Sequence, residues 1–360
     1  MGSYINDNKN LEIKEEKVLI NSRLSNNLIE SNKDQFSNPI NIQFYKYLII
    51  DSYVEYLYDN SFSLFYSINL IYYLIYPTSY KSIIILNLIN NKRIIEIKNA
   101  HNNYITNLRH YLDQINNRDF LLSISNSDCN IKIWDAKNWE CLLNLENIYK
   151  KGYLSSASFL KNNNENFIIT CNSDYTELIK LFNFNGNKMK EINDSNDNSF
   201  FIDTFYDKTL NKTFIITGNN GCIKSYDYHQ NIIYHKYIDK DIWSCFSFII
   251  KIDKDMIKII NASDSGYICI WNFHKGNILT KIKIGIEIYG ICLWNDLYLF
   301  VGTWEKKVQL IDLNRGKVIK KLNKHNNNGV RTIKKIVIPK FGEYLLSHDG
   351  RRIILWKNID

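Results

Sequence analysis

The chain has 360 residues and a formal net charge of +8 at pH 7, with 45% hydrophobic and 14% aromatic residues. This composition supports a large buried core, and a chain that can build such a core does not need a disulfide scaffold. The seven cysteines are scattered, odd in number and without a C-x-x-C pair. We therefore expect free thiols in a reducing compartment.

Residues 1–40 show no sustained hydrophobic period and predict a flexible extension. They hold no apolar segment of the kind that directs secretion, so we expect a cytoplasmic protein, with the nucleus as the alternative. The most apolar stretch, residues 64–76, is too short for the ~20 apolar residues of a membrane-spanning helix. It predicts two consecutive buried strands, and we do not expect an integral membrane protein.

From about residue 42 onward, short runs rich in Ile, Val, Tyr and Phe follow one another. Seven of them resemble the segment IKIWD, at spacings of 48, 48, 44, 45, 40 and 45 residues. Their anchor residues are Leu86, Trp134, Phe182, Tyr226, Trp271, Ile311 and Trp356. A repeat of ~40–45 residues with four strands per unit is typical of a β-propeller blade. The sequence predicts an all-β fold, a single seven-bladed propeller with four-stranded antiparallel blades.

We place the propeller over residues 41–360, after the extension. The predicted blades span approximately 60–98, 101–145, 153–193, 200–238, 241–284, 287–322 and 325–360. The last repeat reaches only its third strand before the sequence ends. Its outer strand should come from residues 42–58, with 17–20 as the second choice, because such a strand would remove an open sheet edge.

The second repeat, which ends in NIKIWD, resembles a repeat of the WD-repeat family of β-propellers. In that family a His, a Ser or Thr, an Asp and a Trp form a hydrogen-bonded tetrad within one blade. The resemblance assigns these roles to His101, Asp128 and Trp134, together with Ser123 or Ser125, of which we take Ser125. A buried indole N–H needs an acceptor and a buried carboxylate needs donors, so the tetrad is structural and not catalytic.

The last repeat is a looser match, since its Asp lies seven instead of six residues before the Trp. Its tetrad residues are His325, Ser347, Asp349 and Trp356. The fifth repeat has the Ser, the Asp and the Trp but no matching His, and the other four lack the tetrad. We expect those repeats to be held by strand order and apolar packing.

Motifs of enzyme active sites are absent from the sequence. The seven histidines do not pair with each other or with cysteine at metal-ligand spacing, and there is no P-loop, G-x-S-x-G or H-E-x-x-H segment. The acidic loop at 191–198 lacks the register of an EF-hand. We expect no metal, no cofactor, no catalytic residue and no enzyme activity. A hydrolase whose site draws on several blades is the second alternative.

Basic residues concentrate near the end of the chain. Residues 305–360 hold 14 Lys and Arg against 5 Asp and Glu, a net of +9, so the last two repeats carry the whole excess. Many lie on predicted outer strands, where Lys protects exposed edges. The Arg351–Arg352 pair only partly resembles the Phe/Leu-Arg-Arg-Gly motif of phosphoinositide-binding propellers, because no Gly follows it.

Tryptophans suggest where a partner would bind, since exposed Trp often anchors an interface. We expect Trp304 on an exposed turn, Trp139 packed against the rim of a blade, and Trp243 and Trp294 in the core.

The sequence predicts a non-catalytic scaffold or adaptor that binds peptide or protein partners and takes no small-molecule substrate. The candidate interaction face consists of Trp304, Lys306, Lys307, Arg331, Arg351 and Arg352. The alternative is binding of an acidic protein, a nucleic acid or a phosphoinositide lipid by the basic last two blades.

Overall fold

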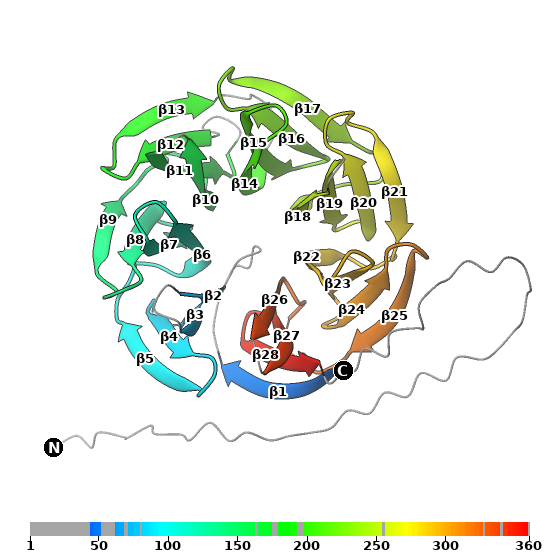
Figure 1. The fold of residues 1–360 in the computed structure, drawn as a ribbon, viewed down its shortest axis with the longest axis horizontal. Coiled ribbons are helices and arrows are strands. Elements are labelled where there is room, and N and C mark those ends of the chain that lie inside the picture. The colour runs from blue at the N-terminus through cyan, green and yellow to red at the C-terminus, as the bar shows by residue number, and fades with distance from the viewer. Residues whose placement is uncertain are drawn as a thin grey trace, which may run out of the picture.

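The computed structural model describes residues 44–51, 62–67, 71–79, 81–162, 165–174, 179–192, 198–253, 256–326, 328–338 and 341–358. These residues form seven four-stranded sheets arranged around a central axis, and no helix occurs among them (Figure 1). The prediction of an all-β, seven-bladed propeller is confirmed. The extension predicted over residues 1–40 lies outside the described residues.

The sheets, called blades 1 to 7, are antiparallel and run from an innermost to an outermost strand. Blade 1 holds β2 (Ser63–Tyr66), β3 (Tyr72–Pro77), β4 (Ile83–Asn87) and β5 (Lys92–Ile97). Blade 2 holds β6 (Ile105–Asp113), β7 (Arg118–Ser125), β8 (Asn130–Asp135) and β9 (Cys141–Leu145). Blade 3 holds β10 (Leu154–Asn162), β11 (Glu165–Asn172), β12 (Ile179–Asn183) and β13 (Lys188–Ile192).

The remaining blades follow in chain order around the ring (Figure 1). Blade 4 holds β14 (Ser199–Asp207), β15 (Lys212–Asn219), β16 (Cys222–Asp227) and β17 (Ile232–Ile238). Blade 5 holds β18 (Cys245–Ile252), β19 (Ile257–Ser263), β20 (Tyr267–Asn272) and β21 (Ile278–Lys283). Blade 6 holds β22 (Ile288–Leu293), β23 (Tyr298–Thr303), β24 (Val308–Asp312) and β25 (Lys317–Leu322).

Blade 7 combines strands from distant parts of the chain. It holds β26 (Thr332–Ile338), β27 (Gly342–His348), β28 (Arg352–Asn358) and, at the outer position, β1 (Phe44–Asp51). β1 runs antiparallel to β28, from Phe44 opposite Asn358 to Asp51 opposite Arg352. Figure 1 shows β1 on the outer edge of the ring beside β28.

The core lies between the blades. Seven clusters of buried apolar side chains occur among the described residues, one at each interface between neighbouring blades. One of them packs Phe62 and Leu74 of the first blade region with Leu346 and Leu355 of blade 7, so apolar contacts complete the ring. Inner strands are apolar because neighbouring blades cover both of their faces, whereas outer strands such as β9 are largely exposed.

Several sequence predictions concern burial. The apolar stretch at 64–76 contributes to the two strands β2 and β3, as predicted. All seven cysteines are free thiols, also as predicted. Trp139 and Trp294 are buried, which confirms both expectations, whereas Trp243 is exposed and its prediction was wrong. The described residues contain no helix of the length and apolarity that a membrane crossing requires.

The two ends of the strands define two faces of the ring. Ile288 at the start of β22 lies opposite Thr303 at the end of β23, and Thr332 lies opposite His348 in the same way. The turn between the second and third strands is therefore at the end where the innermost strand begins. We call this end the start face, and the end that carries the other two turns of each blade the opposite face.

Candidate interaction site

The innermost strands of blades 2 to 6 each have an irregularity of register at their second residue. A β-bulge of this kind takes one residue out of the ladder and re-aims its side chain. The five bulge residues are Thr106, Ser155, Phe200, Phe246 and Tyr289. The first two are small and buried, while the last three are aromatic and half-buried. Equivalent positions thus carry different chemistry on the two sides of the ring.

Four rings form a continuous aromatic arc across blades 4, 5 and 6. The ring centroids of Phe200 and Phe246 are 5.2 Å apart, those of Phe246 and Tyr289 are 5.7 Å apart, and those of Tyr289 and Trp304 are 6.0 Å apart. All three pairs are tilted, at separations where aromatic rings attract one another. The arc ends at Trp304, which is 52% exposed on the start face.

The turn that carries Trp304 is held firmly by its neighbours. The Trp304 amide donates a hydrogen bond to the Glu287 carbonyl at 3.0 Å, and the Val330 amide donates to the Thr303 carbonyl at 3.0 Å. A Cβ atom on Gly329 would lie 2.9 Å from Trp304 Cα, so only glycine allows this close approach. Trp304 is therefore an exposed ring on a fixed backbone.

Trp243 is a second exposed ring on the start face, in the loop that leads into β18. It is 69% exposed, although the buried Ile242 precedes it. The Lys281 ammonium binds Asp239 Oδ1 at 2.5 Å and Asp241 Oδ2 at 2.6 Å, which fixes the loop. The prediction of a core residue failed because the strand begins only at Cys245, after the tryptophan.

Arg331 places a positive charge beside the arc. Its guanidinium carbon lies 4.7 Å from the centroid of the Tyr289 ring, a cation–π contact. A Cβ atom on Gly290 would lie 2.1 Å from the Arg331 carbonyl oxygen, so glycine is required for this approach. The Tyr289 hydroxyl donates to Glu287 Oε2 at 2.8 Å. Burial and this bond raise the pKa of Tyr289 to about 12, against the opposing effect of Arg331, so Tyr289 stays neutral.

Further cations lie on the turns of blades 6 and 7. Lys307 pairs with Glu305 at 2.9 Å, and the Lys306 ammonium donates to the Asn326 carbonyl at 3.2 Å. Arg351 is exposed, and its guanidinium makes no ion pair with any residue that the structure describes. The Asp349 carboxylate accepts the amide of Arg351 at 3.1 Å, which holds this turn in place.

The structure places the six predicted interaction residues on the start face of two neighbouring blades. Trp304, Lys306 and Lys307 share the turn between β23 and β24, and Arg331 immediately precedes β26. Arg351 and Arg352 lie at the corresponding turn between β27 and β28. Trp304 and Arg331 are brought together because both contact Tyr289.

Sequence reasoning missed three of the four rings of the arc, Phe200, Phe246 and Tyr289. It also missed the exposure of Trp243, which lies outside the arc. A signal was present, because an aromatic residue stands second in the innermost strand of three successive repeats. Its meaning depends on the bulges, which the sequence pattern does not reveal.

The basic residues of blades 6 and 7 do not form one surface. Lys334 lines the central channel, and Lys335 binds the Trp294 carbonyl at 2.8 Å and Glu343 at 2.6 Å. Lys317, Lys320 and Lys321 lie on the outer strand β25. The charges that reach the start face are therefore only part of the excess.

The last blade holds all four predicted tetrad residues in contact. Trp356 Nε1 donates to Ser347 Oγ at 2.7 Å, and His325 Nε2 lies 2.7 Å from the same oxygen. His325 Nδ1 lies 3.1 Å from Asp349 Oδ2, an ion-pair contact whose angle is poor for a hydrogen bond. Burial alone would raise the pKa of Asp349, but His325 and two backbone amides lower it to about 2.

Blade 2 contains a shorter network, and its serine corrects the prediction. Trp134 Nε1 donates to Ser123 Oγ at 2.8 Å, and His101 Nε2 lies 2.7 Å from that oxygen. Ser125, the residue we predicted, is buried with its hydroxyl unbonded, because it lies two residues further along the same strand. Asp128 accepts from Asn130 at 3.4 Å and does not bond to the imidazole. Burial, with a smaller effect of Lys132, lowers the pKa of His101 to about 3.

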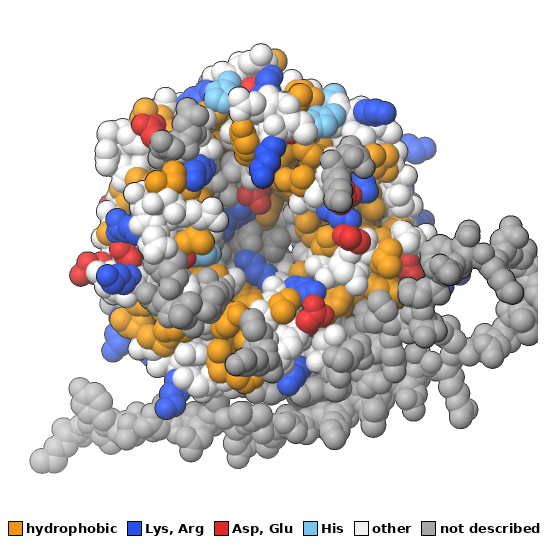
Figure 2. Space-filling model, viewed as in Figure 1, with side chains coloured by type: hydrophobic (Ala, Val, Ile, Leu, Met, Phe, Trp, Pro, Cys, Tyr) orange, Lys and Arg blue, Asp and Glu red, His pale blue; other side chains and the backbone are white. Residues whose placement is uncertain are grey.

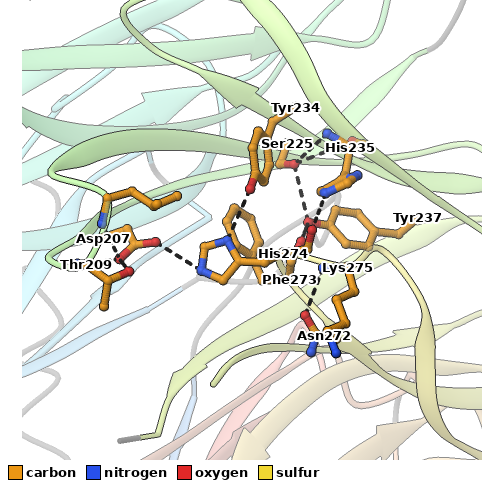
Figure 3. Close-up of polar contacts among 11 residues, drawn as sticks. Asp207, Thr209, Ser225, Tyr234, His235, Tyr237, Asn272, Phe273, His274 and Lys275 are labelled. Carbon is orange, nitrogen blue, oxygen red and sulfur yellow. Dashed lines mark hydrogen bonds and ion pairs between the residues drawn. The ribbon is translucent and has the colours of Figure 1, made fainter. Parts of the chain in front are cut away.

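A cluster of titratable side chains lies on the opposite face, between blades 4 and 5 (Figure 3). His274 Nε2 is 3.1 Å from Asp207 Oδ2, and His274 Nδ1 is 3.2 Å from the Tyr234 hydroxyl. His235 Nε2 lies 2.6 Å from the His274 carbonyl oxygen. Burial would raise the pKa of Asp207, but bonds from Thr209 and the charge of His274 lower it. Both imidazole nitrogens of His274 are engaged, so the cluster joins two blades.

The ring surrounds a channel that Figure 2 shows as a hollow bordered by basic side chains. Two adjoining cavities of about 410 and 400 Å³ lie in it and share Arg109 and Asp203. Arg109 Nη1 donates to Ser158 Oγ at 2.8 Å and to Asp203 Oδ1 at 3.0 Å, and Nη2 donates to the Ile202 carbonyl at 2.8 Å. These bonds tie the innermost strands of blades 2, 3 and 4 together. Across the described ranges, no cluster of three metal-ligating side chains occurs.

The fold defines the protein as a seven-bladed β-propeller whose start face carries an aromatic arc with adjoining cations. A comparison with protein-family models gives no match for the chain, and a comparison with curated proteins gives none either.

Proposed function

We propose that this propeller is a non-catalytic scaffold that binds a peptide or protein partner on its start face. One observation carries the proposal, the aromatic arc with Trp304 and Trp243 exposed on fixed turns. Aromatic residues and Arg are enriched at the centres of protein interfaces. A ring that is already held in place loses little conformational entropy when a partner covers it.

Binding of a polyanion by the last two blades is supported less well. A nucleic acid or an anionic membrane needs cations that follow its charges along one surface. Here the basic residues divide among the start face, the channel and the outer strand β25. The start face also interleaves its cations with Glu287 and Glu305.

We further propose that the chain is a divergent relative of the WD-repeat propellers and acts in the cytoplasm, with the nucleus as the alternative. The Trp–Ser–His contacts of blades 2 and 7 support the relationship. Seven free thiols support a reducing compartment.

Affinity capture with matched variants tests the proposal. The wild-type chain, a Trp243→Ala/Trp304→Ala variant and a Phe341→Ala variant are used to capture proteins from a lysate of the source cells. Phe341 is the control because it is an exposed aromatic residue, 48% accessible, in a turn of the opposite face. Captured proteins are quantified by mass spectrometry, and the affinity of each is then measured with purified components.

The proposal predicts a direct partner whose affinity falls about 30-fold or more in the double tryptophan variant, which corresponds to ~2 kcal/mol. The Phe341→Ala variant should bind that partner as the wild type does. A partner that loses affinity equally in both variants, or only in the Phe341→Ala variant, would overturn the assignment to the start face.

A further inference from the structure

Charge is distributed unevenly along the start face. On the side of blades 4 and 5, three carboxylates that the structure describes already have partners, since Asp239 and Asp241 share Lys281 and Asp264 accepts the Ser244 amide at 2.9 Å. Among the described residues, this side presents the exposed apolar side chains of Ile238 and Trp243, with the exposed Lys240 and Lys283 near them.

The side of blades 6 and 7 presents cations. Arg331 lies beside the Tyr289 ring, Lys306 lies in the Trp304 turn, and the Arg351 guanidinium has no ion pair among the described residues. The carboxylates here are engaged as well, Glu287 by the Tyr289 hydroxyl and Glu305 by Lys307. Among the described residues, the start face therefore combines exposed tryptophans on blades 5 and 6 with a group of cations on blades 6 and 7.

Resting on the function proposed above, we propose that the partner segment is an acidic peptide with an aromatic or aliphatic anchor. Its carboxylates bind Arg331, Lys306 and Arg351, while its anchor packs on the rings of Trp304 and Trp243. Charge-assisted hydrogen bonds between Arg and a carboxylate are strong and directional. The peptide therefore lies with its acidic part over blades 6 and 7 and its apolar part toward blade 5.

The mixed surface favours a peptide over a polymer of uniform charge. The arc offers broad apolar area between the cations and the exposed Trp243, which suits a segment whose side chains change from acidic to apolar. Single-stranded RNA could also stack on aromatic rings, and this is the competing outcome of the experiment below.

The experiment measures fluorescence anisotropy of short labelled peptides on the full chain. The first probe combines acidic residues with a Trp–Leu anchor, the second replaces the acidic residues by Lys, and the third keeps them but replaces the anchor by Ser. The variants are Arg331→Gln/Arg351→Glu and Trp304→Ala, with Lys317→Glu as the charge-reversal control. Lys317 lies on the outer strand of blade 6, away from the start face.

The first probe should bind about tenfold or more tightly than either of the others, which corresponds to ~1.4 kcal/mol. The arginine variant should lose most of that preference over the Lys probe, and Trp304→Ala should weaken the first probe about tenfold. Lys317→Glu should leave all three affinities unchanged. Circular dichroism of each variant excludes unfolding as the cause.

The results distinguish a wrong partner chemistry from a wrong start-face function. If the Lys probe binds as well as the acidic probe and both depend on Trp304, the partner chemistry is wrong and the scaffold function stands. Failure of the acidic probe to bind also overturns the partner chemistry. If a probe binds and no affinity depends on Trp304, the start-face function itself is wrong. An oligouridine that binds more tightly than the acidic probe, in a Trp304-dependent way, would replace the peptide by RNA.

Discussion

Blades 2 and 7 differ from blades 4 to 6 in what holds them and in what they show to solvent. In blades 2 and 7 a buried serine accepts the indole N–H and contacts a histidine, so the indole is satisfied inside the blade. Blades 4 and 5 instead share a cluster of aromatic rings, and Trp271 of blade 5 donates to Asn261 at 2.7 Å.

Blades 4 to 6 carry the aromatic arc on their start face and lack the His–Ser–Trp contacts, as do blades 1 and 3, whose anchor residues are Leu86 and Phe182. Thr106 of blade 2 and Ser155 of blade 3, at the equivalent bulges, are small and buried. Blade 3 has a phenylalanine at the anchor position and no aromatic bulge, so interior contacts and surface chemistry vary independently around the ring. This teaches that the fold is maintained in more than one way, and that one side of the ring is specialised.

Removal of β1 should have the largest effect. Deletion of residues 1–60 leaves the edge of β28 unpaired, and loss of several backbone hydrogen bonds at ~1 kcal/mol each predicts a loss of about 4 kcal/mol or more. Deletion of residues 1–40 keeps β1 and should change stability little. Thermal denaturation of both truncated chains tests this, and equal melting temperatures would contradict a closing role for β1 and show that the contacts inside blade 7 suffice.

Replacement of two tryptophans should affect stability differently, because Trp294 is buried and Trp243 is exposed. Trp294→Ala empties a buried site against Phe300 and removes the Lys335 contact, so we expect a loss of ~3–5 kcal/mol. Trp243→Ala removes a largely exposed ring and should change the free energy of unfolding by less than ~0.5 kcal/mol. Chemical denaturation measures both. A large loss for Trp243→Ala would mean that this ring serves stability instead of binding.

The serines test the polar side of the comparison. Ser347→Ala and Ser123→Ala each leave an indole N–H without its acceptor, and both should cost ~1–3 kcal/mol. Ser125→Ala is the matched control, because its buried hydroxyl has no bond to lose. Unfolding curves that show Ser125→Ala as costly as Ser123→Ala would reverse the correction made to the tetrad of blade 2.

Low pH should reduce the free energy of unfolding through different groups in blade 2 and blade 7. The pKa of His101 in the folded chain is about 3, well below its ordinary value of 6.5, because burial and then Lys132 disfavour its charge. The unfolded chain binds this proton first, so stability falls as the pH drops from 6.5 toward 3, by up to about 1.4 kcal/mol per pH unit. The pKa of Asp349 is lowered from 3.8 to about 2, so its contribution is lost only as the pH falls through that lower range.

Replacement of His101 tests the acid effect. His101→Ala should cost ~1–3 kcal/mol near pH 7.5 through lost hydrogen bonding, but its stability should fall less steeply between about pH 6.5 and 5. Urea denaturation at several pH values gives the slope. A variant with the same slope as the wild type would show that His101 is not the group that titrates.

Periodicity in the sequence was enough to predict the propeller, because every blade repeats the same strands. The tetrads were harder, since Ser123 and Ser125 lie on one face of a strand and spacing does not choose between them. The Asp-to-Trp spacing also gave the wrong expectation for the two tetrad aspartates, Asp128 and Asp349. Blade 7, whose Asp lies seven residues before the Trp, places Asp349 beside His325. The turn that follows Asp349 contains Gly350 with a φ of 88°. Blade 2 matches the spacing of the family better, but its Asp128 accepts a hydrogen bond from Asn130.

The aromatic arc could not be predicted because its rings come from different repeats. Phe246 contacts Phe200 and Tyr289 only because bulges release all three from their ladders. Trp243 was misplaced for a related reason, since the sequence does not show that β18 begins two residues after it.

Site-specific photocrosslinking tests the central claim most directly. A photoreactive phenylalanine analogue is placed at position 304 of the start face or at position 341 of the opposite face, and each chain is irradiated with its captured partner. We predict a covalent adduct with the partner from position 304 and none from position 341. Adducts from position 341 alone would place the partner on the opposite face and contradict the account.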